Sequence, residues 1–187
     1  MMSQQGVTLW FTGLPRAGKS TVGGIVASRL RAAGMERIEI LDGDEVRAGL
    51  CRDLGFSHAD REENIHRITF VSKLLTRNGV ISIVAAISPY AEGRERAREE
   101  IENFLLVWCH ASVDDCAARD FKGLYEKARR GELDNLTGVN DPYEEPRDAD
   151  LILDTVDENA EQSADRVMEL LVERGYLADP VATGVET

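Results

Sequence analysis

The sequence predicts an α/β fold in which a central parallel sheet of five strands carries helices on both faces. Five short runs rich in apolar and β-branched residues alternate with longer stretches whose apolar residues have helical spacing. The third run, residues 80–87, is almost wholly apolar, as expected of a strand that is buried on both faces. A glycine-rich turn lies between the first run and the first helical stretch.

Length and composition predict a single globular domain over residues 1–187. The 187 residues are 43% hydrophobic and 30% charged, an ordinary globular balance. The 22 basic and 34 acidic side chains give a net charge of −12, which disfavours nucleic acid and anionic membranes as partners. Three scattered cysteines, and no apolar run of about 18 residues, indicate a reduced, cytoplasmic protein without a membrane span or signal segment.

Apolar spacing and glycine stops predict where each strand and helix lies. In the first helical stretch, Val22, Val26 and Leu30 share a face, and Gly34 ends the helix. We place Trp10 and Trp108 in the core. The expected strands are 7–12, 37–41, 80–87, 105–109 and 151–154. The expected long helices are 19–33, 60–78, 89–104 and 157–175, and we interpret the charged run Glu92–Glu100, with Arg94 and Arg98, as a solvated helix face.

The segment 120–146 has neither a strand pattern nor the pattern of a long helix. It is polar and contains Gly123, Gly131, Gly138, Pro142 and Pro146. Long irregular segments inside compact domains are usually functional, so we expect a mobile lid here. The C-terminal tail, residues 177–187, is expected to be flexible.

The stretch Gly13–Ser20, GLPRAGKS, matches the phosphate-loop pattern GxxxxGK[ST] at every fixed position and lies between a strand and a helix. Its glycines let backbone N–H groups point at phosphate oxygens, and the following helix adds its positive end. Lys19 would bridge the terminal phosphates, and the Ser20 hydroxyl would ligate Mg²⁺. We therefore predict the three-layer fold shared by P-loop nucleoside-triphosphate hydrolases and nucleotide kinases.

The class of P-loop protein follows from motifs that the chain lacks. It has no NKxD motif, which a GTPase needs for guanine, and no LSGGQ signature, which marks ABC-type ATPases. Its small size and its expected lid favour a kinase of a small molecule.

Two carboxylates follow the second expected strand, in Asp42-Gly43-Asp44. They lie at the carboxyl end of a strand beside the phosphate loop, where open α/β sheets bind ligands. One could accept a proton from an acceptor hydroxyl, and either could hold Mg²⁺ through water. A solvated acidic turn that caps the next helix is the alternative interpretation.

A second group of residues offers the local cations that an anionic acceptor needs. Arg61 and Asn64 are three residues apart and share a helix face, and Arg47 and Arg67 lie near them in the sequence. Planar guanidinium groups suit phosphate or sulfate oxygens, and Phe56 could stack on a base. An ordinary charged helix beside a core phenylalanine is the alternative.

These stretches, in their order and spacing, resemble the adenylylsulfate kinase family over about residues 7–156. The resemblance implies transfer of the ATP γ-phosphate to the 3′-hydroxyl of adenosine 5′-phosphosulfate (APS), giving 3′-phosphoadenosine 5′-phosphosulfate (PAPS) and ADP. It also implies Mg²⁺, a homodimer and a role in sulfate activation. Beyond the phosphate loop, the matching segments are Leu41–Arg47, Asp53–Ser57, Asp60–Ile65, Ile87–Tyr90, Arg119–Tyr125, Thr137–Val139 and Asp141–Glu144.

The resemblance also implies roles for single residues. Asp44 would be the base or metal-side carboxylate, with Asp42 beside it and Lys19 on the phosphates, and Ser20 and Asp44 would hold the metal. The ATP-binding residues would be Gly13, Leu14, Pro15, Arg16, Ala17, Gly18, Lys19, Ser20, Thr21 and Arg119. The acceptor-binding residues would be Arg47, Phe56, Arg61, Asn64, Ile87, Ser88, Lys122, Leu124, Leu136, Thr137 and Gly138.

The chain departs from the family pattern at three places. Pro15-Arg16 replaces the usual Ser-Gly pair of the phosphate loop, which removes one N–H and adds a cation. Leu136 replaces a phenylalanine that stacks on the acceptor adenine, and loss of such a ring weakens base binding by about 1–3 kcal/mol. Ala91 replaces an arginine. Two alternatives follow: a relative that phosphorylates another hydroxyl, and a catalytically silent nucleotide-binding module.

Overall fold

A computed structural model describes residues 4–178 and confirms the α/β fold. Its five strands are all parallel and lie in the order β2-β3-β1-β4-β5. Most of the tail that we expected to be flexible, residues 179–187, lies outside the described part. The strands are β1 (Val7–Thr12), β2 (Ile38–Asp42), β3 (Ile81–Ala85), β4 (Phe104–His110) and β5 (Leu151–Asp154).

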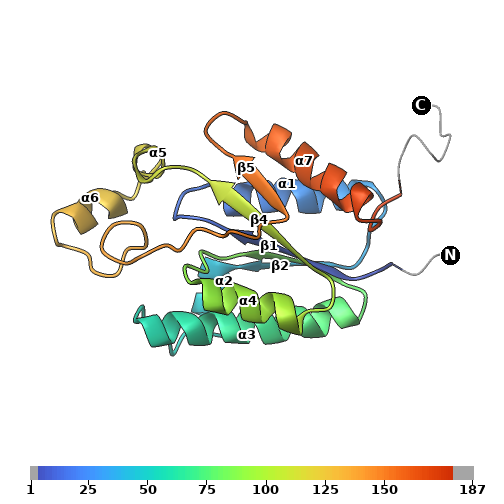
Figure 1. Ribbon diagram of the computed structural model, residues 1–187, viewed down its shortest axis with the longest axis horizontal. Coiled ribbons are helices and arrows are strands. Elements are labelled where there is room, and N and C mark those ends of the chain that lie inside the picture. Colours follow the sequence, from blue (N-terminus) through green and yellow to red (C-terminus); the bar gives the residue numbers. More distant parts are fainter. Residues whose placement is uncertain (1–3, 179–187) are drawn as a thin grey trace.

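Helices cover both faces of the sheet. The long ones are α1 (Lys19–Ala32), α3 (His58–Arg77), α4 (Ala91–Glu100) and α7 (Ala160–Glu173), and the short ones are α2 (Gly43–Ala48), α5 (Val113–Ala118) and α6 (Leu124–Arg129). Figure 1 shows α1 and α7 together on one face and α3 and α4 on the other, with α5 and α6 beyond one end of the sheet. No helix within residues 4–178 combines the length and the apolar character needed to cross a membrane.

The central strand β1 joins two apolar clusters, one on each face of the sheet. All six of its residues are buried, and Leu9 pairs with Ile83 of β3 and with Leu105 of β4. Because successive side chains of a strand point to opposite faces, Trp10 packs in the cluster on the α3–α4 side and Phe11 in the cluster on the α1–α7 side. β1 is therefore buried on both faces of the sheet, and the phosphate loop follows it directly.

The parallel register brings several strand ends to one edge of the sheet. Asp42, the last residue of β2, pairs with Ala85, the last residue of β3, while Thr12 at the end of β1 pairs with Trp108 of β4. The loops that leave β1, β2 and β3 therefore open side by side, at the switch point where ligands bind in open α/β sheets.

Several predicted boundaries are wrong by a few residues. Strand β3 ends at Ala85 and not at residue 87, because the chain turns away and Ser88 takes a left-handed φ of 41°. Phe104 belongs to β4, where it pairs with Thr8, and not to the preceding helix. Helix α7 begins after Asn159, whose side chain and that of Gln162 form a reciprocal capping box.

The predicted solvated face of α4 is wrong for Arg94, and Trp108 is not a core residue. Arg94 is 3% exposed and donates hydrogen bonds to the carbonyls of Ser88 and Glu144, both at 2.6 Å. The segment around Glu144 covers this part of α4, and charge patterning along α4 alone cannot show that. Trp108 is only partly buried, and its ring packs edge-on against His110 with centroids 4.9 Å apart.

We expect Arg94→Met to lower the free energy of unfolding by about 3 kcal/mol, because the buried Ser88 carbonyl and the Glu144 carbonyl lose a charged donor. Urea denaturation followed by circular dichroism measures the loss. Glu99→Met is the control, because Glu99 is an exposed residue of the same helix, and its substitution should cost under about 1 kcal/mol. Equal losses for both variants would contradict a structural role for Arg94.

Candidate active site

A cavity of about 780 Å³ opens at the carboxyl edge of the sheet. It lies at the upper end of the range of about 300–1,000 Å³ that is usual for small-molecule sites. Its walls come from the phosphate loop, the turn after β2, the start of α3, the loop after β3, the lid and the segment from β5 into α7. The sequence-predicted residues that line it are Pro15, Arg16, Gly18, Lys19, Ser20, Thr21, Asp42, Asp44, Arg47, Phe56, Arg61, Asn64, Ile87, Ser88, Arg119, Lys122, Leu124, Leu136 and Thr137.

Four predicted site residues do not line this cavity: Gly13, Leu14, Ala17 and Gly138. Leu14 and Gly138 line a separate pocket, and a Cβ on Gly138 would come within 2.6 Å of the Leu14 side chain. A Cβ on Gly13 would come within 2.4 Å of the Cys109 carbonyl oxygen. These glycines therefore allow close packing around the phosphate loop, with the lid on one side and β4 on the other.

The phosphate loop holds its lysine by its own carbonyls. Gly18 takes a left-handed φ of 96°, and α1 begins at Lys19. The Lys19 ammonium donates to the carbonyl oxygens of Gly13 at 2.9 Å and Leu14 at 2.7 Å, and the residue is only 8% exposed. Burial lowers the pKa of Lys19 to about 8, because few water molecules remain to stabilise the charged form.

The two carboxylates after β2 have different partners. The Ser20 hydroxyl donates to Asp42 Oδ2 at 2.6 Å, and Asp42 Oδ1 accepts the backbone N–H of Asp44 at 2.9 Å. Asp42 therefore does cap α2, as the alternative interpretation held, and it also reaches the phosphate loop. Asp44 is exposed on the cavity wall.

Two arginines share the ring of Phe56. The guanidinium of Arg47 lies 4.5 Å from the ring centroid and that of Arg61 lies 5.6 Å from it, while Phe56 remains 55% exposed and is not a core residue. Arg47 also donates to the Gly55 carbonyl at 2.8 Å. Burial, and then the neighbouring charge of Arg61, lower the pKa of Arg47. Two cations this close repel each other, so the pair favours an anionic ligand.

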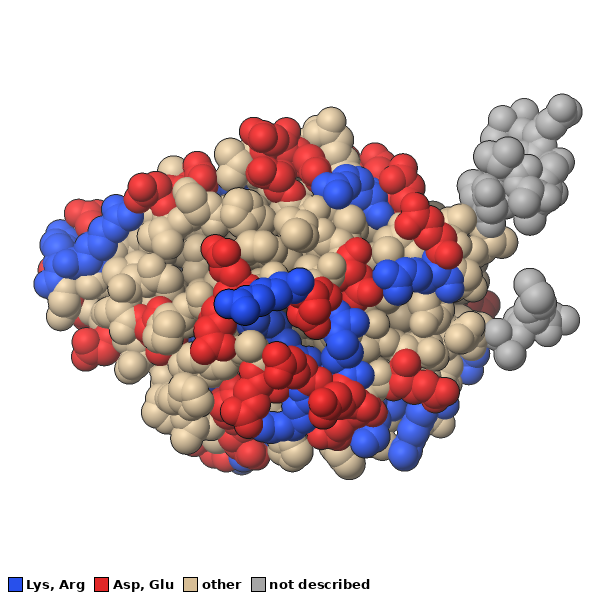
Figure 2. All heavy atoms as spheres, viewed as in Figure 1, with Lys and Arg blue, Asp and Glu red and all other residues tan. Residues whose placement is uncertain are grey.

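Arg67, the third arginine of the predicted group, lies outside the cavity. Its guanidinium bonds both oxygens of Asp53, at 2.7 and 2.9 Å, and Glu63 at 2.8 Å. Two carboxylates neutralise its charge, so we do not include it among the ligand-binding cations. On the face shown in Figure 2, basic side chains are likewise interspersed with acidic ones.

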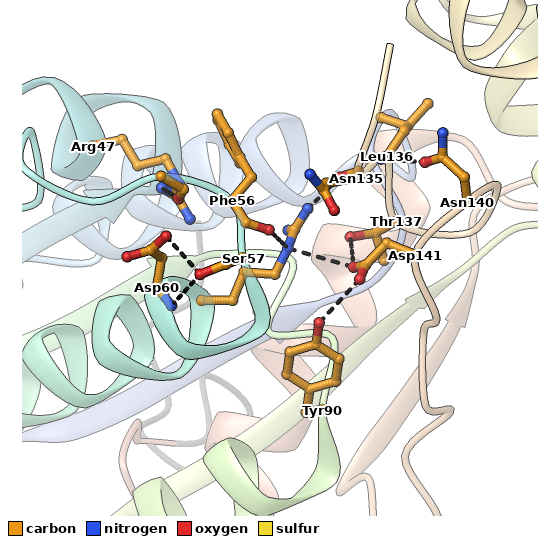
Figure 3. Close-up of polar contacts among 12 residues, drawn as sticks. Arg47, Phe56, Ser57, Asp60, Tyr90, Asn135, Leu136, Thr137, Asn140 and Asp141 are labelled. Atoms are coloured by element: carbon orange, nitrogen blue, oxygen red, sulfur yellow. Dashed lines mark hydrogen bonds and ion pairs between the residues drawn. The ribbon is translucent and has the colours of Figure 1, made fainter. Parts of the chain in front are cut away.

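Asp141 connects the lid to α3, a connection that sequence reasoning missed. It pairs with Arg61, its Oδ2 lying 3.4 Å from Arg61 Nε, and accepts hydrogen bonds from the hydroxyls of Tyr90 at 3.1 Å and Thr137 at 3.3 Å (Figure 3). Arg61 is 5% exposed and also donates to the carbonyls of Phe56 and Asn135. Asp141 stands in a segment that matches the family, but its side-chain partners are far away in sequence.

Asn64 carries an unpaired acceptor on the cavity wall. The residue is 7% exposed, and its Oδ1 has no hydrogen-bond partner among the described residues. A buried acceptor without a partner costs roughly 1–3 kcal/mol, which a donor group on a ligand would recover. Leu136, by contrast, is 8% exposed and packs in the same apolar cluster as Leu14 and Tyr125.

Comparison with known proteins decides the family. The adenylylsulphate kinase family model matches residues 5–154, which is most of the chain. The chain belongs to this family. The adenylyl-sulfate kinase of Picosynechococcus sp. is 52% identical over 176 residues, covering 94% of this chain and 99% of the relative. That of Halothermothrix orenii is 51% identical over 180 residues, covering 96% and 97%.

Solved structures agree with the fold. The Mycobacterium tuberculosis APS kinase CysC, in complex with AMPPNP and APS, has a TM-score of 0.85 and 44% identity, over 89% of this chain and 98% of that one. A gluconokinase from Sinorhizobium meliloti has a TM-score of 0.57 at 16% identity, which shows a shared fold alone.

We expect the affinity for a triphosphate to fall as pH rises above about 8, because Lys19 then loses its proton in the free protein. Phosphate oxygens favour the charged lysine, so its pKa rises on binding and the complex takes up a proton. Calorimetry of AMPPNP binding between pH 7 and 10, in buffers of different ionisation enthalpy, measures both effects. Lys19→Arg stays charged and should remove this dependence, and proton release on binding would contradict the assignment.

Proposed function

We propose that this protein is an adenylylsulfate kinase, which transfers the γ-phosphate of ATP to the 3′-hydroxyl of APS and forms PAPS and ADP. One observation carries the proposal: a single cavity joins a complete phosphate loop to a pocket of two arginines and an exposed aromatic ring. The names of relatives about half identical to this chain support the same activity.

The phosphate loop is the proposed ATP site. Lys19 exchanges its hydrogen bonds to loop carbonyls for bonds to the terminal phosphates, and the N–H groups of the loop and of the first turn of α1 complete the cradle. Arg119, directly before the lid, lines the same cavity and donates to the Thr155 carbonyl at 2.6 Å, which holds it beside the donor. These groups stabilise the charge on the transferring phosphate.

The residues beside the loop fit Mg²⁺. Ser20 and Asp42 place two hard oxygen atoms 2.6 Å apart, and Asp44 adds a carboxylate on the same wall. Mg²⁺ prefers oxygen ligands and retains several water molecules. We propose that Ser20 binds it directly and that Asp42 and Asp44 bind its water molecules. When bound, the ion neutralises charge on the phosphates.

The second half of the cavity is the proposed APS site. Arg47 and Arg61 bind the phosphosulfate, and the exposed face of Phe56 packs on the adenine. The unpaired Oδ1 of Asn64 accepts a hydrogen bond from the acceptor. Asp44 accepts the proton of the 3′-hydroxyl as its oxygen bonds to phosphorus and the bond to ADP breaks. Ile87, Ser88, Lys122, Leu124, Leu136 and Thr137 complete this proposed pocket.

Two of the three departures from the family pattern leave the wall of the acceptor pocket closed. Ala91 does not line the cavity, and its N–H donates to Glu144 at 2.6 Å. Leu136 lines the cavity but is buried in the core, so it still closes the wall. Lys19, Ser20 and Asp44 meet in one cavity, which a catalytically silent binding module would not need. The homodimer implied by the family stays a prediction.

The direct test incubates the purified protein with ATP, Mg²⁺ and APS, and follows ADP release together with PAPS by anion-exchange chromatography. We expect one PAPS for each ADP, and slow release when APS is omitted or replaced by AMP or gluconate. ADP release that APS does not accelerate would contradict the proposal and favour a different acceptor.

Asp44→Asn should lower kcat by about 100-fold, because an amide cannot accept the hydroxyl proton. Asp42→Asn should instead raise the Mg²⁺ concentration needed for half-maximal rate, because it loosens the contact with Ser20. Glu45→Gln is the control, since Glu45 is an exposed neighbour on α2 that does not line the cavity. Steady-state kinetics distinguish the three, and a normal kcat for Asp44→Asn would exclude Asp44 as the base.

A further inference from the structure

We propose that Arg16 is a positioning residue that docks the base of the lid, Asp120–Tyr125, onto the phosphate loop. In doing so it places two cations at the donor nucleotide: Lys122, in the base of the lid, and Arg119, directly before it. The inference rests on the proposed function only in that the donor is a nucleoside triphosphate.

The first observation is the backbone of Arg16 itself. Its φ is 70°, a left-handed conformation that side chains with a Cβ rarely adopt. The family resemblance places a glycine here, which takes this conformation without strain. A strained residue persists where surrounding contacts hold it, and such contacts often serve function.

The second observation is where the Arg16 side chain goes. Its Nε lies 3.4 Å from Asp120 Oδ1, and its guanidinium carbon lies 4.3 Å from the centroid of Phe121. The Asp120 carboxylate is 1% exposed and also accepts the backbone N–H groups of Lys122 at 3.2 Å and Tyr125 at 3.0 Å. Arg16 therefore binds the carboxylate that shapes the whole base of the lid.

A second, neighbouring contact also holds the base of the lid against the phosphate loop. The hydroxyl of Tyr125 donates to the carbonyl of Pro15 at 2.8 Å, and Tyr125 is 1% exposed. Two successive residues of the phosphate loop thus hold the two ends of the lid base, one through a side chain and one through a carbonyl.

Arg119 and Lys122 flank the docked pair Asp120-Phe121, and both line the large cavity. Fixing the pair on the loop fixes the direction in which these two cations enter the cavity. Phe121 is 82% exposed, so Arg16 provides a specific contact for a ring that is otherwise largely in solvent. The lid that we expect to move would then begin after Tyr125, and not at residue 120.

The geometry favours docking over direct phosphate binding by Arg16. Its Nε is paired with a buried carboxylate and its guanidinium lies over an aromatic ring, whereas the Lys19 ammonium donates to neutral carbonyls. A Phe121 variant distinguishes docking from direct phosphate binding. Loss of the ring keeps the charge of Arg16 and removes one of the two contacts that Arg16 makes with the base of the lid.

The test compares Arg16→Gly, Phe121→Ala and the double variant. Glycine suits the left-handed backbone, so Arg16→Gly should fold. We expect each single variant to weaken AMPPNP binding, measured by calorimetry without acceptor, by roughly two- to fivefold. The double variant should bind AMPPNP no more weakly than Arg16→Gly, because both substitutions disrupt the same contact between the phosphate loop and the base of the lid. Phe70→Ala is the control, since Phe70 is an exposed phenylalanine on α3 that does not line the cavity.

Amide hydrogen exchange is the second measurement. Peptides that cover residues 119–125 should exchange faster in both single variants, while peptides of β1 keep their protection. Unchanged exchange at 119–125 would overturn the proposal. Weakened binding in Arg16→Gly that Arg16→Lys restores, with Phe121→Ala unaffected, would show a direct phosphate contact and overturn it too. If APS fails as acceptor while the binding and exchange results hold, the proposed function fails and the docking stands.

Discussion

The site depends on gathering positively charged side chains around one cavity of a chain whose net charge is −12. The cavity cations are held mainly by neutral carbonyl oxygens: Lys19 by Gly13 and Leu14, Arg47 by Gly55, and Arg119 by Thr155. Carbonyl dipoles fix a cation in place and leave its charge available to a ligand. Arg67 shows the contrast, because two carboxylates neutralise it and it lies outside the cavity.

Arg61 is held both by neutral carbonyls and by a carboxylate of the lid, so it links anion binding to the lid. Carbonyls of Phe56 and Asn135 hold it, and the Asp141 carboxylate lies 3.4 Å away. Asp141 also binds Tyr90 and Thr137, so a single carboxylate connects α3, the loop after β3 and the lid. An anion that binds Arg61 would therefore contact the same hydrogen-bond network around Asp141 that holds this part of the lid in place.

The lid, residues 120–146, contacts the rest of the protein at both of its ends. Its base contacts the phosphate loop through Arg16 and Tyr125. Its far end contacts the protein through Asp141 and through Glu144, which accepts the N–H of Ala91 at the start of α4. Both substrates are anionic, so a lid held at its two ends next to the two proposed sites suits a reaction in which water must be excluded.

Apolar runs and glycine spacing are local, so the sequence by itself determined the five strands, the phosphate loop and the order of motifs that places the chain in its family. It also identified most residues of the cavity wall, some from their place at the ends of predicted strands and the others through the family resemblance. Only the tertiary structure showed four further features. They are the different contacts of Asp42 and Asp44, the position of Arg67 outside the cavity, the burial of Arg94 and the several side-chain partners of Asp141. Each depends on contacts between distant segments, such as Arg61 with Asn135, 74 residues apart. Spacing along one element carries no information about what packs against it.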